Sequence, residues 1–254
     1  MTARPEPRLS ARAIARLAAL VGLLAAALTV HGLWRLLHLP SPWPRLFLGS
    51  AARLFGARAR IVGTPLRRDV IFLSNHLSWM DILLLAGATG SAFVAKAELR
   101  GAPLVGWLCT LNRTLFVRRG DRMGIERQVA ELRDALAHGW AITIFPEGTT
   151  GDGRELLPFK AALLGAIDPP PPGLMIQPVR IDYGAATDEL AWVGDEPGQS
   201  HALRVLRRRG TFPVTLHLID PFYPAATGNR KAIAATARAA IETAAGQCTP
   251  APKV

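Results

Sequence analysis

A histidine and an aspartate stand five residues apart in residues 74–81 (SNHLSWMD), just after a short apolar run. Histidine titrates near neutral pH, and a carboxylate that accepts its Nδ1 proton leaves Nε2 free to take a proton from a hydroxyl. Two residues five apart in one helix would lie about 140° apart around its axis, too far to meet. His76 must therefore precede the helix that carries Asp81, and the pair is typical of a site that activates a hydroxyl group.

Each member of this pair also has an ordinary structural interpretation. Ser78 and Asp81 match the S-x-x-D variant of a capping box, in which the carboxylate only caps a helix. His76 could equally be a hydrogen-bonded histidine at the end of a strand. The pair therefore needs corroboration from elsewhere in the chain.

Residues 145–150 (FPEGTT) supply that corroboration. They leave an apolar run through a proline and a glycine, and they carry the carboxylate of Glu147 and the hydroxyls of Thr149 and Thr150. The carboxyl ends of strands are where open α/β sheets build their sites. We therefore expect this loop to lie beside His76.

The rest of the chain alternates apolar runs with helical patterns, which predicts an α/β fold. Strands are expected at residues 70–73, 92–95, 115–117, 141–145, 174–181 and 214–219. Helices are expected at residues 79–86, 124–138, 159–167 and 230–245. The third of these ends before the proline run at residues 169–172, because proline cannot continue a helix.

Length and composition define the setting. The chain has 254 residues, and its 30 basic side chains against 19 acidic ones give a formal charge of +11. One α/β domain with an appendage fits this length, and the charge suits an anionic lipid, an acidic carrier protein or nucleic acid. Cys109 and Cys248 are far apart, which favours neither a disulfide framework nor a zinc site.

The amino-terminal region narrows the choice of partner. Residues 17–34 carry no formal charge over 18 positions, with arginines on both sides, which suits a helix that crosses a membrane or dips into one leaflet. A cleaved signal peptide is the alternative, disfavoured by the long apolar core and by the lack of a small-x-small site before Trp34. Residues 39–48 suit an interfacial turn. Lipid is therefore favoured over nucleic acid.

Taken together, the Asn-His-x4-Asp and Phe-Pro-Glu-Gly segments resemble the glycerolipid acyltransferases, the family of 1-acylglycerol-3-phosphate O-acyltransferases. The resemblance covers roughly residues 60–219. It implies an α/β fold, with a sheet flanked by helices and an amino-terminal membrane-associated helix segment. Residues 1–48 are then the membrane-anchoring segment and residues 49–254 the acyltransferase domain.

The resemblance also implies roles for individual residues. His76 and Asp81 would form the catalytic dyad, and Arg119 would contact the phosphate of the acceptor. Lys160 is a further cation for a phosphate or the acyl donor, although a solvated lysine at a helix start explains it equally well. The expected acceptor-binding set is Arg119, Glu147, Gly148, Thr149, Thr150, Lys160 and Pro178.

Two departures from the family pattern bear on the acceptor. Arg113 stands where many members have glycine, and Thr150 stands where the third block commonly ends in arginine. Losing that arginine removes a bidentate phosphate contact, although Arg113, Arg118 and Arg119 could compensate. The favoured acceptor is 1-acylglycerol-3-phosphate, giving phosphatidic acid. The alternative is lyso-ornithine lipid, whose acylating enzymes can carry Thr-Thr after the glycine.

The implied reaction has His76 remove the proton of the acceptor hydroxyl as its oxygen attacks the thioester of acyl-CoA or acyl carrier protein. Asp81 would hold the imidazole, and amides near His76 or Pro178 could stabilise the oxyanion. No metal or organic cofactor is needed, and the expected location is the membrane, at the cytoplasmic face of the inner membrane if the source is bacterial. A non-catalytic basic protein that binds membrane surfaces is the alternative of another class. The chain lacks Gly-x-Ser-x-Gly and Gly-x4-Gly-Lys-Ser/Thr, which disfavours a serine hydrolase and a P-loop enzyme.

Overall fold

The computed structural model describes residues 10–117 and 125–246, and within them the chain forms one seven-stranded sheet. The strand order is β1-β7-β6-β2-β5-β3-β4. Strands β6, β2, β5, β3 and β4 run parallel, whereas β7 is antiparallel to β6 and parallel to the edge strand β1. The strands are β1 Ala57–Val62, β2 Val70–Ser74, β3 Ala92–Lys96, β4 Leu115–Val117, β5 Ala141–Ile144, β6 Met175–Asp182 and β7 Phe212–Leu218.

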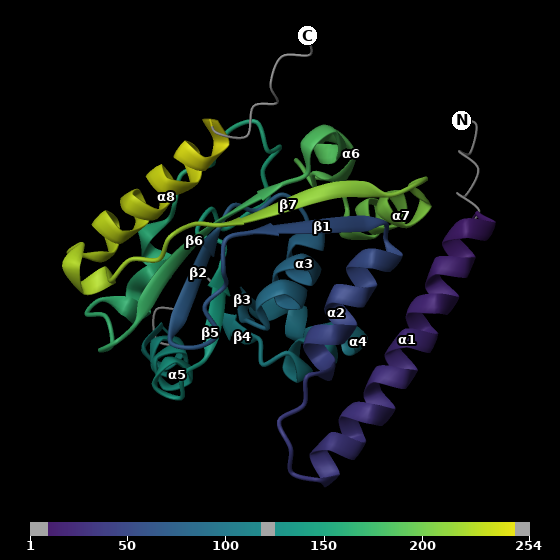
Figure 1. Ribbon diagram of the computed structural model, residues 1–254, viewed down its shortest axis with the longest axis horizontal. Helices are drawn as coiled ribbons and strands as arrows, with labels where there is room; N and C mark the ends of the chain where they lie inside the picture. The colour runs from purple at the N-terminus through teal and green to yellow at the C-terminus, as the bar shows by residue number, and fades with distance from the viewer. Residues whose placement is uncertain (1–9, 118–124, 247–254) are drawn as a thin grey trace.

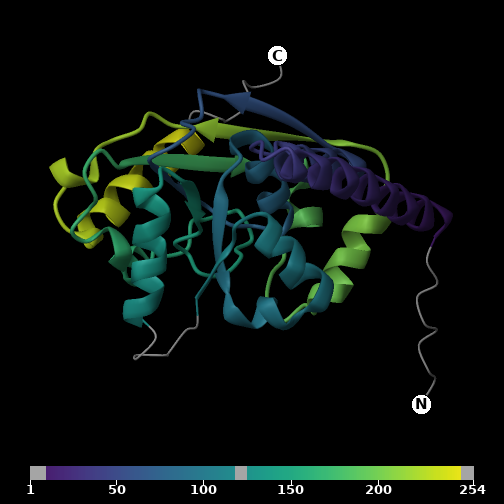
Figure 2. The same ribbon diagram turned by 90° about the horizontal axis from the view of Figure 1, so that it is seen from below.

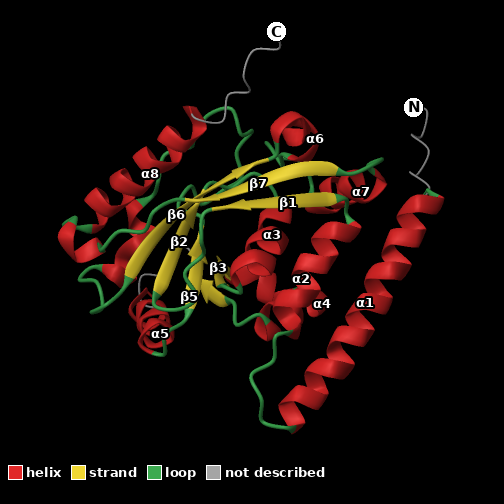
Figure 3. Cartoon of the chain, in the orientation of Figure 1, coloured by secondary structure: helices red, strands yellow, loops and turns green. Residues whose placement is uncertain are grey.

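Helices cover both faces of this sheet, as Figures 1 and 3 show. Helices α5 and α8 lie on one side, and α1, α2, α3, α4 and α7 lie on the other. The α-helices of the described residues are α1 Ala11–Leu36, α2 Trp43–Leu54, α3 Met80–Thr89, α4 Pro103–Leu111, α5 Ile125–Ala137, α6 Thr187–Leu190, α7 Gly198–Arg207 and α8 Arg230–Gly246. The fold is thus an α/β sheet flanked by helices, as the sequence predicts.

The central strand β2 separates two hydrophobic cores. Successive side chains of a strand point to opposite faces, so Val70 and Phe72 enter the core formed with α2 and α3. Ile71 and Leu73 enter the core formed with α5, α8 and residues 161–167. All five residues of β2 are buried, which explains why its sequence is uniformly apolar up to Ser74.

Most expected elements are present, with four differences, one of which is that helices α4, α6 and α7 were not expected. Residues 161–167 form a 3-10 helix, and a short segment between Pro158 and Pro169 is where such geometry is common. Strand β1 was not expected: five of its six residues are exposed at the sheet edge, so its sequence carries no hydrophobic period. Residues 43–48, expected within a turn, begin α2, because proline is favourable in the first turn of a helix. Helix α2 spans the expected division between residues 48 and 49, which stays a prediction.

Helix α1 lies along the outside of the molecule, against α2 and α7, and Figure 2 shows it (purple) beyond the helices that cover the sheet. It has 26 residues and a mean hydropathy of 2.2 over its most apolar window, of which 11% is buried. Its length and composition would allow it to cross a membrane, although amino-terminal signal sequences have the same properties. Arg16 attaches it to α7 by donating to the carbonyls of Leu206 (3.0 Å) and Arg208 (2.8 Å), at a helix end where such carbonyls lack helical partners.

Helices α2 and α3 cross at two glycines. A methyl group on Gly87 would lie 2.6 Å from the Cα of Gly49 and 2.9 Å from its nitrogen. Both of these are backbone atoms that cannot rotate away. The close crossing sets the position of α3, the helix that carries Asp81.

Replacing Gly87 by alanine should therefore lower the free energy of unfolding by about 1–3 kcal/mol, the usual consequence of overpacking a core. Urea unfolding of the detergent-solubilised protein, followed by circular dichroism, measures the change. Gly22→Ala is the matched control, because a methyl group there meets nothing within 4 Å and alanine favours a helix over glycine. Equal stability of the two variants would contradict a tight crossing at Gly87.

Candidate active site

His76 lies in the loop between β2 and α3, and Asp81 is the second residue of α3. The Nδ1 atom of His76 is 2.9 Å from Oδ2 of Asp81. This confirms the geometric expectation that the histidine precedes the helix. The two side chains meet because the five-residue loop 75–79, between β2 and α3, places His76 beside the first turn of α3.

The carboxylate of Asp81 is completely buried and accepts four hydrogen bonds. Its Oδ2 atom accepts from His76 Nδ1 at 2.9 Å, from the Leu77 amide at 2.7 Å and from the Ser78 amide at 2.9 Å. Its Oδ1 atom accepts from the Tyr183 hydroxyl at 2.6 Å. Asp81 therefore does bond back to Ser78 as in a capping box, and it contacts the histidine as well.

This network determines which nitrogen of His76 carries the proton. Oδ2 of Asp81 is an acceptor for two amides, so the Nδ1 atom that faces it must donate, and Nε2 is left as an acceptor. The ring stacks on Phe145 with centroids 3.9 Å apart and an angle of 13° between the planes. The His76 side chain is 18% exposed. A partly exposed, oriented imidazole with a free Nε2 is suited to taking a proton from a hydroxyl.

Glu147 holds the same loop from the other side. It is 2% exposed, and its two oxygens accept from the amides of His76 (2.8 Å) and Leu157 (3.0 Å). Burial raises the pKa of Glu147, against the hydrogen bonds from these two amides, which lower it. The Gly151 amide also donates to the His76 carbonyl at 2.8 Å. The loop after β5 therefore hydrogen-bonds to both the amide and the carbonyl of His76.

Gly148, Thr149 and Thr150 belong to the same loop after β5. Gly148 has a φ of 71°, a left-handed conformation that favours glycine, and its amide donates to the Phe145 carbonyl at 3.0 Å. The Thr150 hydroxyl donates to the carbonyl of Trp192, whose own amide donates to the Leu77 carbonyl at 2.8 Å. Thr149 is exposed. The structure thus brings Glu147, Gly148 and Thr150 together around His76, and their roles toward a substrate stay predictions.

Other expected site residues lie differently. Lys160 is exposed, and its backbone amide donates to the Pro146 carbonyl at 2.8 Å. Pro178 is buried in β6 in register with Leu73. The guanidinium of Arg113 lies over the Trp140 ring at 5.0 Å. Arg118 and Arg119 lie outside the described residues.

A small cleft of about 20 Å³ lies beside His76, lined by residues 75–77, by Glu147, by the loop at residues 151–156 and by Arg180 of β6. The Asn75 side chain connects the loop after β2 to β6. Its amide nitrogen donates to the Ile181 carbonyl (3.0 Å), and its oxygen accepts from the Ile181 amide (2.7 Å). Sequence reasoning missed Arg180 and Tyr183. The one available signal for Arg180 was its position two residues after Pro178, on the same face of a strand.

The backbone amides nearest to His76 are already engaged. Those of His76, Leu77 and Ser78 donate to Glu147, Asp81 and Asp81 respectively. These three amides are therefore not free to stabilise an oxyanion, although this was expected of amides at this turn. They serve instead to hold the two carboxylates.

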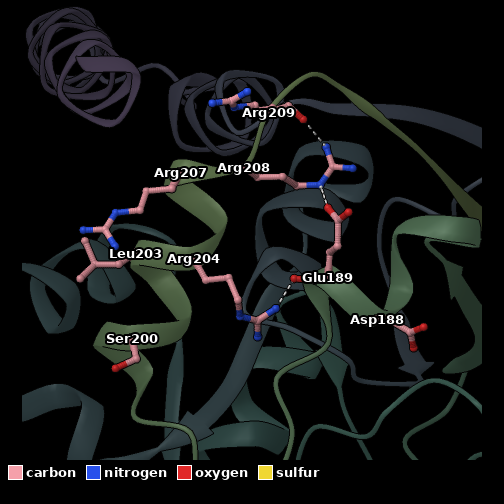
Figure 4. A pocket seen from close by; sticks show the side chains of 8 residues that line it. All are labelled: Asp188, Glu189, Ser200, Leu203, Arg204, Arg207, Arg208 and Arg209. Carbon is pink, nitrogen blue, oxygen red and sulfur yellow. Dashed lines mark hydrogen bonds and ion pairs between the residues drawn. The ribbon is translucent and has the colours of Figure 1, made fainter. Parts of the chain in front are cut away.

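Two further hollows lie away from the cleft. One, of about 720 Å³, lies between α6 and α7 among arginines that are partly ion-paired. Figure 4 shows the ion pair between Arg208 and Glu189, whose atoms are 2.6 Å apart. Arg204 also contacts Glu196, at 2.7 Å. The other, of about 360 Å³, is an apolar groove between α1, α2, α3 and α4 that contains Trp79. Within the two described stretches, no three histidine, cysteine or acidic side chains come together to hold a metal ion.

Comparison with known proteins agrees with this geometry. Residues 58–182 match the family model described as Acyltransferase. The chain is also 36% identical over 208 residues to a lyso-ornithine lipid O-acyltransferase of Brucella abortus, covering 76% of this chain and 78% of that protein. The chain belongs to the acyltransferase family.

Two other similarities of this acyltransferase are shorter in extent or lower in sequence identity. A 1-acyl-sn-glycerol-3-phosphate acyltransferase of Neisseria gonorrhoeae is 38% identical, but over 39% of each chain. The crystal structure of the 1-acyl-sn-glycerophosphate acyltransferase PlsC from Thermotoga maritima superposes with a TM-score of 0.62 at 22% identity, covering 94% of this chain and all (100%) of that one. This likeness shows that the two share a fold. The family resemblance and the fold class predicted from the sequence are thus confirmed.

Tyr183 offers a direct test of the Asp81 network. Burial and the charge of Asp81 raise the pKa of Tyr183 well above its usual value, so the hydroxyl stays protonated and donates. Tyr183→Phe should lower the free energy of unfolding by about 1–3 kcal/mol, because it removes a hydrogen bond to a buried charged group. Urea unfolding measures this. Tyr223→Phe is the control, because Tyr223 is 59% exposed; similar losses in both variants would contradict the proposed importance of the bond.

The buried Glu147 predicts a pH dependence of stability. Its pKa is raised in the folded protein, so its contribution to stability is fully present below its unfolded pKa of about 4.3 and is lost as pH rises through the folded value. The free energy of unfolding of the unmodified protein minus that of Glu147→Gln should therefore fall over the pH range that begins at about 4.3, the unfolded pKa. Urea unfolding across this range measures the difference. The exposed Glu98→Gln serves as the control, and a difference that rises with pH would contradict the raised pKa.

Proposed function

We propose that this acyltransferase moves a fatty acyl group from acyl-CoA or acyl carrier protein to the free hydroxyl of a lysolipid, and that its preferred acceptor is lyso-ornithine lipid. The observation that carries the proposal is the His76 imidazole. Its Nδ1 atom is held by a buried carboxylate while Nε2 is left to accept a proton beside a small cleft. Such a base is what the attack of a hydroxyl on a thioester needs.

The reaction follows from the residues of the site. Nε2 of His76 takes the proton as the acceptor oxygen bonds to the thioester carbonyl carbon, and the carbon–sulfur bond then breaks. The departing thiolate takes the proton from the imidazolium, so the enzyme returns to its starting state. Asp81 keeps Nδ1 protonated and stabilises the positive charge that the ring gains. A thioester is already activated, so a positioned base can perform this transfer without a covalent enzyme intermediate.

The choice of acceptor rests on two observations. The Brucella abortus relative, which matches over three quarters of this chain, acts on lyso-ornithine lipid by its name. The relative named for 1-acyl-sn-glycerol-3-phosphate matches over 39% of the chain. The Thr150 hydroxyl is also engaged with the Trp192 carbonyl, so it does not replace the phosphate-binding arginine that is common at this position. The acceptor that the sequence analysis favours, 1-acylglycerol-3-phosphate, is therefore less well supported than its alternative.

Attachment to the membrane is part of the proposal. The outer side of α1 exposes large apolar side chains, and so does α4, where Leu104 is 58% and Trp107 44% exposed. An exposed apolar surface of this kind suits insertion into the interfacial region of a bilayer. The apolar groove between α1 and α4 suits an acyl chain. In a bacterial cell, the site would then face the inner leaflet of the inner membrane.

A non-catalytic basic protein that binds membrane surfaces is the competing function. Such a protein has no need of an oriented imidazole, a buried carboxylate and a cleft in one place. The arginines between α6 and α7 suit both proteins, because they could meet anionic lipid in either case. His76 therefore separates the two functions.

His76→Ala should reduce acyl transfer by about 10²–10⁴-fold, the usual contribution of a general base. The measurement is transfer of a labelled acyl group to a panel of lysolipids by the purified protein in detergent. Folding and recovery in the membrane fraction should be unchanged. His138→Ala is the matched control, because the His138 side chain is 67% exposed.

The panel also tests the acceptor. Lyso-ornithine lipid should be acylated faster than 1-acylglycerol-3-phosphate at equal concentration. Faster acylation of 1-acylglycerol-3-phosphate would overturn the proposed acceptor and leave the acyltransferase intact. Normal transfer by His76→Ala would overturn the role of the histidine.

A further inference from the structure

Arg180 is a cation of the cleft whose side chain makes no hydrogen bond or ion pair among the residues that the structure describes. It lies near the carboxyl end of β6, next to the loop that carries His76. Its Nε atom is buried and has no hydrogen-bond partner, and among the described residues no carboxylate lies within ion-pair distance of its guanidinium. Arg208 also has a buried Nε atom without a hydrogen-bond partner, but unlike Arg180 it lies 2.6 Å from a carboxylate, that of Glu189.

The register of the sheet places Arg180 at the level of the site. β2 and β6 run parallel with Ser74 beside Val179, so the next step brings Asn75 to the level of Arg180. The two hydrogen bonds between Asn75 and Ile181 hold this register at 3.0 and 2.7 Å. The pairing of β2 with β6 therefore places Arg180 level with Asn75, the residue that precedes His76.

The neighbours of Arg180 do not neutralise it. On the adjacent strand it is in register with His217, whose pKa is lowered first by burial, and also by the charges of Arg180 and Arg60, while Asp182 raises it. A buried donor of a charged group without a partner is costly, and a guanidinium presents a planar fork that matches the two oxygens of a carboxylate. The unpaired guanidinium of Arg180 therefore indicates that a ligand supplies the oxyanion it binds.

We propose that Arg180 binds the oxyanion of the acceptor headgroup and, in lyso-ornithine lipid, the carboxylate of ornithine. This inference rests on the proposed function. The cleft would then hold the headgroup of the acceptor. A headgroup bound at Arg180 presents the hydroxyl of the acceptor toward His76. Arg180 then takes the place of the arginine that is common in the family at the position of Thr150.

The acidic groups of the cleft favour a carboxylate over a phosphate. Glu155 lines the rim and is exposed, and Glu147 is buried in the wall. Ornithine that is attached through one amino group keeps a carboxylate and an amine, which suit Arg180 and Glu155 respectively. A doubly charged phosphate would meet the same acids unfavourably. Arg154, the other cation of the cleft, is exposed and lies 3.8 Å from Asp188.

The test compares Arg180→Gln, which removes the charge, with Arg180→Lys, which keeps the charge and loses the fork. Each is combined with His76→Ala, so that binding of labelled lyso-ornithine lipid in detergent micelles is measured without turnover. We expect the Kd to rise about tenfold or more for Gln and by less for Lys, as for the loss of a charge-assisted bidentate contact. In the active enzyme the KM for lyso-ornithine lipid should rise while the KM for the acyl donor does not.

Thermal unfolding separates ligand binding from a structural role. Removing an unpaired, partly buried cation should leave the Tm of Arg180→Gln unchanged or higher, whereas loss of a structural contact would lower it. Arg58→Gln, an exposed arginine of β1, is the matched control and should change none of these quantities. The inference would be overturned if Arg180→Gln left the Kd and the KM for lyso-ornithine lipid unchanged. It would also be overturned if the variant lowered the Tm and raised the KM for donor and acceptor equally.

The acceptor panel keeps this inference distinct from the proposed function. If the unmodified enzyme prefers 1-acylglycerol-3-phosphate, the proposed acceptor fails. A raised KM for that lipid in Arg180→Gln would then still support oxyanion binding by Arg180, through the phosphate. If lyso-ornithine lipid is acylated and Arg180→Gln binds it normally, the proposed function stands and the role of Arg180 is wrong.

Discussion

The site depends on one buried charge, the carboxylate of Asp81. An ionised carboxylate removed from water must be hydrogen-bonded or it destabilises the fold, and Asp81 receives four donors. Two of them are the amides of Leu77 and Ser78, so the loop after β2 has to wrap around the start of α3. A third is Tyr183, just beyond β6, which brings the neighbouring strand into the same arrangement. The fourth is His76, whose position thus follows from the needs of the carboxylate.

Glu147 makes a second contact of the same kind from the exit of β5. Its oxygens accept from the amides of His76 and Leu157, so one carboxylate links the backbone of the histidine to the loop at residues 151–157. Strands β5, β2 and β6 are adjacent and parallel, and their carboxyl ends meet at one edge of the sheet. Three loops that are far apart in the sequence therefore converge on one imidazole, as is usual for sites of open α/β sheets.

The polar and the apolar hollows near this imidazole are separate. The cleft contains Arg180, Glu155 and His76, whereas the groove between α1 and α4 is lined almost entirely by apolar side chains. The two share no lining residue, and the short loop from His76 to Trp79 connects them in the sequence. A lysolipid substrate and a fatty acyl donor have this same division into a polar headgroup and an apolar chain. The arrangement offers each part a surface of matching polarity on either side of the reacting hydroxyl.

The sequence by itself determined the local features of this protein. The spacing of His76 and Asp81 excluded a shared helix, and apolar patterns located β2, β5, β6 and the helices α1, α3, α5 and α8, because these patterns are local. It missed β1, whose exposed edge position leaves no period, and α2, whose prolines also suit a turn, and it did not locate α4, α6 or α7. Only the tertiary structure decided that Tyr183 donates to Asp81 and that Arg180 reaches the cleft. Both side chains come from the region of β6, about a hundred residues from His76, and strand register is set by the pairing of distant segments, which local patterns do not record.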